Sequence, residues 1–191
     1  MMTTLSADGA FPLRLLIAGG QTGVDRAALE FALEVGIPCA GWCPAGRRSE
    51  DGPIPARFPL REASSPAYPQ RTRQNVRDAD ATLIFTAGQP GGGTALTAAF
   101  ARRLGKPCLV VDLDTTAVAS AAANVLAWLQ TIAPTVLNVA GPRASEAPHL
   151  PPLVRQVLAR ALRPAPDASP PAWPPAPPRR PRQGRLFPDG P

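Results

Sequence analysis

Short apolar runs alternate along the chain with stretches in which apolar residues recur every three or four positions. The runs lie at residues 14–18, 39–42, 81–86, 108–113 and 135–139. The stretches with helical spacing lie at residues 22–35, 68–79, 94–104, 117–131 and 150–162. Strands that alternate with helices form βαβ units. We therefore predict a three-layer α/β sandwich, with a mainly parallel sheet of about five or more strands and helices on both faces.

Two local patterns add detail to this scheme. Residues 108–113 are almost continuously apolar, which predicts a strand buried on both faces, with Asp112 at its carboxyl end. The run TGVD at residues 22–25 resembles a capping box, in which Asp25 takes the place usually held by Glu or Gln. We therefore expect the first long helix to begin at about residue 22.

Two glycine-rich turns connect predicted strands to predicted helices, GGQTG at residues 19–23 and GGGT at residues 91–94. The first N–H groups of a helix lack partners within the helix, and with the helix dipole they attract an anion such as phosphate. Because the carboxyl ends of parallel strands meet at one edge, we predict that both turns hold one phosphorylated ligand there. Neither turn matches GxGxxG or a P-loop, so tight turns in which only glycine fits are the alternative. The predicted contacts are backbone at Gly19, Gly20, Gly23, Gly91, Gly92 and Gly93, and side chains at Gln21, Thr22, Thr94 and Thr97.

A long segment at residues 44–66 is rich in charged groups and proline. Loops longer than about 12–15 residues in a compact domain are usually functional or disordered. We favour an ordered loop that covers a site, with disorder as the alternative. The helix predicted at residues 68–79 follows, and Gln70, Arg71, Asn75 and Asp78 can share one polar face by their spacing.

Composition limits the classes of protein. The net charge is +6, and almost all of the positive charge comes from arginine. This charge suits an anionic ligand or weak contact with nucleic acid; the alternative is that the arginines only form a solvated surface. Three cysteines without a framework spacing and a single histidine, His149, favour reduced thiols, a cytoplasmic location and no metal site. No apolar run is long enough to span a membrane, and no secretory signal is evident at the N-terminus. We expect a disordered lead-in at residues 1–12, one domain at 13–163 and a disordered Pro/Arg-rich tail at 164–191.

Several longer runs resemble the molybdenum carrier family: GGQTGVDRAAL, GWCPAGRRSEDGPIPARFPLRE, YPQRTRQNVRDADATLIF, GGTALT, GKPCLVVDLD and VLNVAGPR, in this order. The resemblance covers about residues 13–162. It implies a Rossmann-like fold in the circularly permuted branch of a nucleotide-ligand superfamily, homo-oligomers (dimers or tetramers), and a bound phosphorylated pterin or nucleotide, with molybdenum cofactor (molybdopterin) as one candidate. The polar residues within its motifs, which we infer to contact the ligand, are Arg26, Arg47, Arg48, Glu50, Asp51, Arg71 and Asn75.

Related phosphoribohydrolases of this superfamily carry the motif PGGxGTxxE, whose Glu is catalytic. The matching segment here, PGGGTALT at residues 90–97, is one residue short and has Thr97 in place of the Glu. A hydroxyl cannot replace a carboxylate that stabilises a cation or handles a proton. This departure predicts a binding or carrier protein with no catalytic residue. The alternative is a hydrolase of a nucleotide-derived ligand that uses Asp51, Glu50 or Asp112.

The tail contains the sequence QGRLF, which has the Q-x-x-L-F pattern of bacterial sliding-clamp ligands. Such peptides place two apolar side chains in a pocket while the glutamine contacts its rim. The third hypothesis is therefore a replication or repair interaction protein whose partner contacts are Gln183, Leu186 and Phe187. The pattern is short, and a chance match is the alternative.

Overall fold

The computed structural model describes residues 9–166 and 171 of the chain. Its centre is a parallel five-stranded sheet with the strand order β3-β2-β10-β8-β9. The strands are β2 (Leu15–Ile17), β3 (Cys39–Ala40), β8 (Ala81–Thr86), β9 (Cys108–Asp112) and β10 (Val136–Ala140). Of these five strands, β10 comes last in the chain, yet it lies in the middle of the sheet, between β2 and β8.

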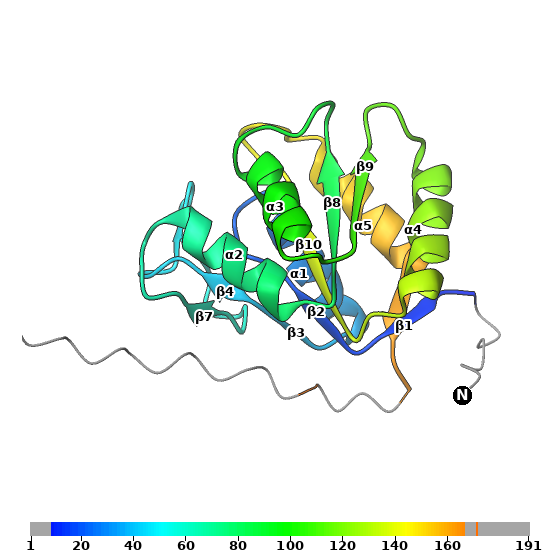
Figure 1. Cartoon of the computed structure of the whole chain (residues 1–191), viewed down its shortest axis with the longest axis horizontal. Helices are drawn as coiled ribbons and strands as arrows, with labels where there is room; N and C mark the ends of the chain where they lie inside the picture. The colour runs from blue at the N-terminus through cyan, green and yellow to red at the C-terminus, as the bar shows by residue number, and fades with distance from the viewer. Residues whose placement is uncertain (1–8, 167–170, 172–191) are drawn as a thin grey trace, which may run out of the picture.

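Helices cover both faces of the sheet. They are α1 (Val24–Val35), α2 (Tyr68–Asp78), α3 (Gly92–Arg103), α4 (Val118–Ile132) and α5 (Leu150–Ala161). Helices α2 and α3 pack together on the face toward the viewer in Figure 1, whereas α5 packs against both α1 and α4 on the other face. The predicted α/β sandwich, Rossmann-like in its layers, is confirmed. None of the helices in the described part of the chain is both long and apolar enough to cross a membrane.

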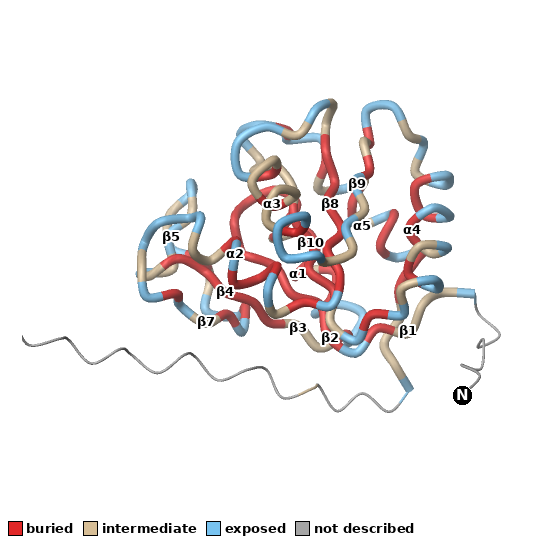
Figure 2. The backbone as a smooth tube through the Cα atoms, in the orientation of Figure 1, coloured by how far each residue is buried: buried red, intermediate tan, exposed pale blue. Residues whose placement is uncertain are grey.

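The core lies along the middle strands, which are buried on both faces because helices cover each side. All six residues of β8 are buried, and Leu137 and Val139 of β10 are fully buried. Figure 2 shows these buried residues gathered at the centre of the molecule, with exposed residues on the outer surface of α4. Removal of this apolar area from water is the main stabilising contribution to the fold.

The prediction that residues 108–113 form a strand buried on both faces is wrong. Strand β9 is the edge of the sheet, and Cys108 and Val110 are exposed. Only Val111 of its five residues is buried. A continuously apolar run does not distinguish a central strand from an edge strand that leaves apolar side chains exposed.

A second, two-stranded parallel sheet joins the two ends of the described domain. It consists of β1 (Phe11–Leu13) and β11 (Leu162–Pro164). Leu13 is fully buried, and β1 lies against α4. The sequence pattern does not predict this pairing, and Phe11 and Pro12 belong to a strand where the lead-in was expected.

The long loop at residues 44–66 is ordered, as favoured from the sequence. Strand β4 (Trp42–Cys43), just before the loop, pairs with β7 (Arg61–Glu62), and β5 (Arg48–Ser49) forms a hairpin with β6 (Gly52–Pro53). The guanidinium of Arg47 organises the remainder of the loop. It donates hydrogen bonds to the backbone carbonyls of Ile54, Pro55, Phe58 and Leu60.

Candidate functional site

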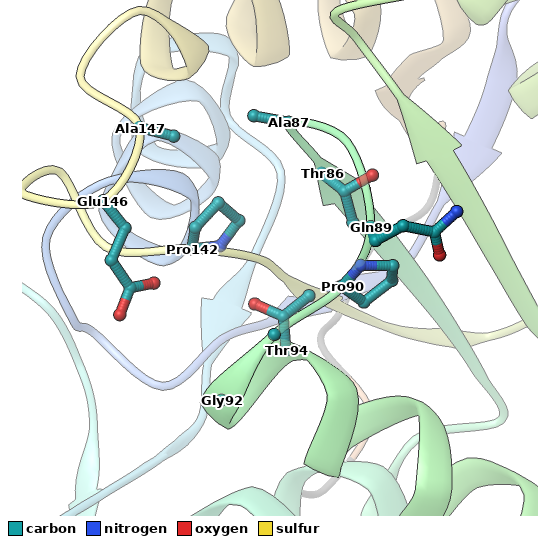
Figure 3. A pocket seen from close by; sticks show the side chains of 10 residues that line it. Thr86, Ala87, Gln89, Pro90, Gly92, Thr94, Pro142, Glu146 and Ala147 are labelled. Carbon is teal, nitrogen blue, oxygen red and sulfur yellow. The ribbon is translucent and has the colours of Figure 1, made fainter.

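Two adjoining cavities lie at the carboxyl ends of β8 and β10, against the start of α3. Their volumes are about 260 and 250 Å³, and the walls of both include Gly92, Thr94 and Glu146. Together they reach the size of small-ligand sites, roughly 300–1,000 Å³. Figure 3 shows the first cavity, with Pro142 and Glu146 on one side and Thr86 and Thr94 on the other.

The start of α3 is open. Gly91 is its N-cap, no side chain caps the helix, and its first turn contains no acidic residue. A Cβ added to Gly91, Gly92 or Gly93 would meet nothing within 4 Å. Gly92 has a φ of +45°, in the left-handed region that favours glycine. The N–H groups of this turn lack acceptors within the helix, and the cavity gives a ligand access to them.

The first glycine loop is packed instead of open. A Cβ added to Gly19 would lie 1.6 Å from Nη1 of Arg71, and one added to Gly20 would lie 2.5 Å from Leu60. A Cβ on Gly23 would lie 2.4 Å from a backbone oxygen of the β10–α5 loop. None of these three glycines belongs to a cavity wall. At these three glycines, neighbouring protein atoms leave no space for a side chain. Their approach to a ligand stays a prediction.

The carboxylate of Asp25 lies beside this first loop, since a Cβ added to Gly19 would lie 2.8 Å from one of its oxygens, and it forms a 3.0 Å ion pair with Arg71. Burial raises the pKa of Asp25, while Arg71 and the backbone of Gln21 and Gly19 oppose that rise. The predicted capping box is wrong, because Gly23 is the N-cap of α1 and no side chain caps it.

The two loops nevertheless meet at one cavity. Gln21, Asp25 and Arg71 lie in the wall of the second cavity, together with Gly92 and Gly93. The first loop therefore contributes side chains to the site, and the second loop contributes backbone.

A third loop completes the site, and the sequence patterns did not single it out. It follows β10, and its Arg143 and Glu146 line the second cavity and are 3.2 Å apart. The Arg143 guanidinium lies 6.0 Å from the ring centre of Tyr68, which is also in the wall. The available signal was the Gly141-Pro142 turn directly after a predicted strand, since that turn must lie at the same edge as the glycine loops.

Residues 16–162 match the model of the circularly permutated YpsA SLOG family, which is most of the chain. The chain belongs to this family. It is also similar to the crystal structure named "Putative molybdenum carrier protein" from Syntrophus aciditrophicus SB, with 42% identity and a TM-score of 0.76. That similarity covers 78% of this chain and 94% of the other. No functionally curated protein matches the sequence.

In this SLOG family member, the polar residues of the long loop do not reach the cavities. None of Arg47, Arg48, Glu50 and Asp51 belongs to a cavity wall. The Arg47 guanidinium donates its hydrogen bonds to backbone carbonyls of the loop itself, and Arg48 is exposed on β5. The loop packs over the first glycine loop through Leu60. That it covers a ligand site stays a prediction.

Glu50 and Asp51 tether the β5–β6 hairpin to its neighbours. The Glu50 carboxylate accepts hydrogen bonds from the hydroxyls of Thr22 and Ser145 and from the Ser145 N–H at 3.2 Å. Burial acts to raise the pKa of Glu50, but these hydrogen bonds outweigh it and the pKa is lowered. The hydrogen bonds from Arg26 and Ser49 lower the pKa of Asp51 to about 2. Thr22 and Arg26 therefore contact the hairpin and do not line a cavity.

Two more expected ligand residues have structural roles. Asn75 is 2% exposed, and its side chain accepts from the Trp42 N–H at 2.8 Å and donates to the Trp42 carbonyl at 3.0 Å. Its amide is thus used to hold β4 against α2. Thr97 does lie in the cavity wall, where its hydroxyl donates to the Gly93 carbonyl at 2.9 Å.

The carboxylates of the hydrolase alternative are all outside the cavity walls. Besides Glu50 and Asp51, this holds for Asp112, whose carboxylate accepts hydrogen bonds from the N–H groups of Gly88 and Asp114. The pKa of Asp112 is lowered, first by the Gly88 N–H. The acidic residues that do line the cavities are Asp25 and Glu146.

No metal-binding cluster of three His, Cys, Asp or Glu residues exists within the described ranges. Cys39, Cys43 and Cys108 are free thiols, and burial raises the pKa of Cys39 and Cys43. The motif with Gln183, Leu186 and Phe187 lies outside the residues that the structure describes.

Proposed function

We propose that this protein binds and carries a phosphorylated pterin or nucleotide-like ligand, with molybdenum cofactor as the leading candidate, and does not cleave it. The observation that carries the proposal is the open start of α3 at the cavity, where a Cβ added to Gly91, Gly92 or Gly93 would meet nothing within 4 Å. An anionic phosphate placed there would accept hydrogen bonds from the first N–H groups of the helix and would be stabilised by its dipole.

The contrast between the two glycine loops supports this choice of subsite. The first loop already has an internal anion beside it, the buried Asp25 carboxylate, whose pKa the backbone of Gln21 and Gly19 acts to lower. The first turn of α3 has no acidic residue, so no carboxylate of the helix itself competes with a phosphate there. Arg143, in the wall of the second cavity, adds a cation that can face the same anion.

The absence of a Glu at position 97 favours binding over hydrolysis. The Thr97 hydroxyl is in the cavity wall but donates to a carbonyl of its own helix. Thr97 therefore offers the ligand no carboxylate where related phosphoribohydrolases have their catalytic Glu.

Molybdenum cofactor is the cargo that we propose for this site. In that cofactor the pterin part holds the metal through its own sulfur atoms, so the protein needs to bind only the ring system and the phosphate. The similar structure from Syntrophus aciditrophicus SB, which is named as a putative molybdenum carrier, points to the same ligand. The cytoplasm, where reduced thiols persist, is the proposed location.

A homo-oligomer, either a dimer or a tetramer, is part of the proposal. The edge strand β9 and the end of α3, which contact each other, expose Val110 and Leu104 by 43% and 37%. Exposed apolar side chains on an edge strand favour a second copy of the chain as cover. Light scattering on the purified protein would show the mass of the assembly, and a strict monomer would remove this part.

The direct test is to identify what the protein carries. The chain would be purified from cells that make molybdenum cofactor, and the small molecules released on denaturation would be analysed by mass spectrometry. The proposal expects a phosphorylated pterin or nucleotide in near-stoichiometric amount. Protein that releases neither, and that binds no member of a pterin-phosphate and nucleotide panel in titrations, would contradict it.

A further inference from the structure

Gln21 has an orientation that its surroundings fix. It is 7% exposed and lies in the wall of the second cavity, beside Gly92 and Gly93. Two backbone N–H groups, from Thr22 and Glu50, each donate to its Oε1 at 3.0 Å. Only the amide oxygen can accept these bonds, so the two donors determine which end of the amide is oxygen and which is nitrogen.

The other end of this amide has unused hydrogen-bonding capacity. Nε2 of Gln21 is buried and has no hydrogen-bond partner among the residues that the structure describes. A buried donor without an acceptor is costly, and most such groups in native proteins are satisfied by some partner. Because Gln21 belongs to the cavity wall, a ligand in that cavity can supply the missing acceptor.

We propose that Nε2 of Gln21 donates a hydrogen bond to a ring oxo group of the ligand. The site therefore selects an oxo-substituted ring, such as a 6-oxopurine or a 4-oxopteridine, over the matching amino-substituted ring. This inference rests on the proposed function, because it takes the cavity beside α3 as the binding site of a phosphorylated heteroaromatic ligand.

The site prefers the oxo-substituted ring because the amide oxygen of Gln21 is already used. A free glutamine recognises adenine with both ends of its amide, accepting from the 6-amino group and donating to N7. Here Oε1 already accepts two bonds, so it has no lone pair left for an amino group. A 6-amino group would bring a donor against the Nε2 donor, and both would stay unsatisfied. A 6-oxo group brings an acceptor to the same place.

The position of Gln21 also suits a single ligand that spans both subsites. Gln21, Tyr68 and Gly93 line one cavity of about 250 Å³. A ligand whose phosphate binds at Gly93 can thus present its ring to Nε2, with the Tyr68 side chain as an aromatic neighbour.

The test compares matched ligands on the full-length, unmodified protein by isothermal titration calorimetry. The probes are IMP against AMP, and a 4-oxopteridine monophosphate against its 4-amino analogue. We expect the oxo member of a pair to bind at least about tenfold more tightly. Equal binding within each pair, or preference for the amino member, overturns the role of Gln21 but leaves the proposed function intact. Failure of all four probes to bind overturns both.

Gln21→Glu is the informative variant. It keeps an oxygen acceptor for the Thr22 and Glu50 N–H groups but replaces the Nε2 donor with an oxygen. We expect it to lose the oxo preference, or to reverse it. Gln70→Glu makes the same chemical change on α2 outside the cavity walls and should keep the wild-type preference. If Gln21→Glu does not fold, Gln21→Leu replaces it in the test. This variant adds no charge, and we expect it to bind the two members of a pair equally. An unchanged preference in either Gln21 variant overturns the proposal.

Discussion

The buried ion pair between Asp25 and Arg71 links the first turn of α1 to α2, and its removal should destabilise the fold. The side chains are 3% and 13% exposed, and their charged atoms are 3.0 Å apart. In Arg71→Met the Asp25 carboxylate stays buried without its cation. Breaking a buried pair in this way costs about 3–5 kcal/mol. For a domain of this size that loss lowers Tm by roughly 6–20 °C.

The pH dependence of the stability lost in Arg71→Met tests whether the unpaired Asp25 carboxylate causes that loss. Burial raises the pKa of Asp25 and Arg71 opposes the rise, so Arg71→Met should raise that pKa further. An acid whose pKa is raised in the folded state gains stability as pH falls, because the folded state binds the proton more tightly. The deficit of Arg71→Met relative to wild type should therefore be largest at pH 8 and smaller at pH 5.

Urea unfolding followed by circular dichroism at both pH values measures this deficit. The double variant Arg71→Met/Asp25→Asn is the control, since it removes both charges and should recover stability relative to Arg71→Met at pH 8. A deficit under about 1 kcal/mol, or one of equal size at pH 5 and pH 8, would refute the account of this pair.

Three further predictions follow from particular contacts. The pKa of Asp51 is lowered to about 2 by Arg26 and Ser49, so the stabilisation it gives to the β5–β6 hairpin should be lost as pH falls from about 4 through 2; hydrogen exchange should show this loss in wild type and not in Asp51→Asn. Asn75→Ala leaves two buried backbone groups of one residue unpaired and should cost about 2–5 kcal/mol in urea unfolding; a cost below 1 kcal/mol would argue against that role. Gly20→Ala should lower Tm by several degrees, because φ is +78° and Leu60 fills the space; an unchanged Tm would show that the loop can relax.

Much of the fold follows from the sequence pattern. Strand β8 coincides with its predicted bounds at residues 81–86, since six buried apolar or β-branched residues between polar turns suit a central strand. The edge position of β9 was missed because apolar content reports average burial and not the number of neighbouring strands. The pairing of β1 with β11 joins segments about 150 residues apart in sequence, and short three-residue strands carry no periodic signal.

The candidate site was predicted only in outline. The patterns GGQTG and GGGT look alike as sequences, yet Gly20 is covered by Leu60 and Gly92 is open. What separates them is Asp25, an internal anion in the first turn of α1 that the second loop lacks. Sequence spacing predicted both turns at one edge, but it could not show which of them the chain's own side chains already fill. Arg143 was missed for a related reason, since a single arginine in a turn gives no pattern.

The central claim is that the start of α3 binds the phosphate of the ligand, and one pair of variants at Gly93 tests it. Gly93→Ala adds a methyl group in open space and should keep ligand binding, whereas Gly93→Asp places a carboxylate in the first turn that competes with phosphate. Isothermal titration would compare GMP and a pterin phosphate with their dephosphorylated forms. We expect at least one phosphorylated ligand to bind wild type and Gly93→Ala at least about tenfold more tightly than its dephosphorylated form, and Gly93→Asp to lose that difference. Binding that is equal with and without phosphate, or that Gly93→Asp leaves unchanged, would contradict the account.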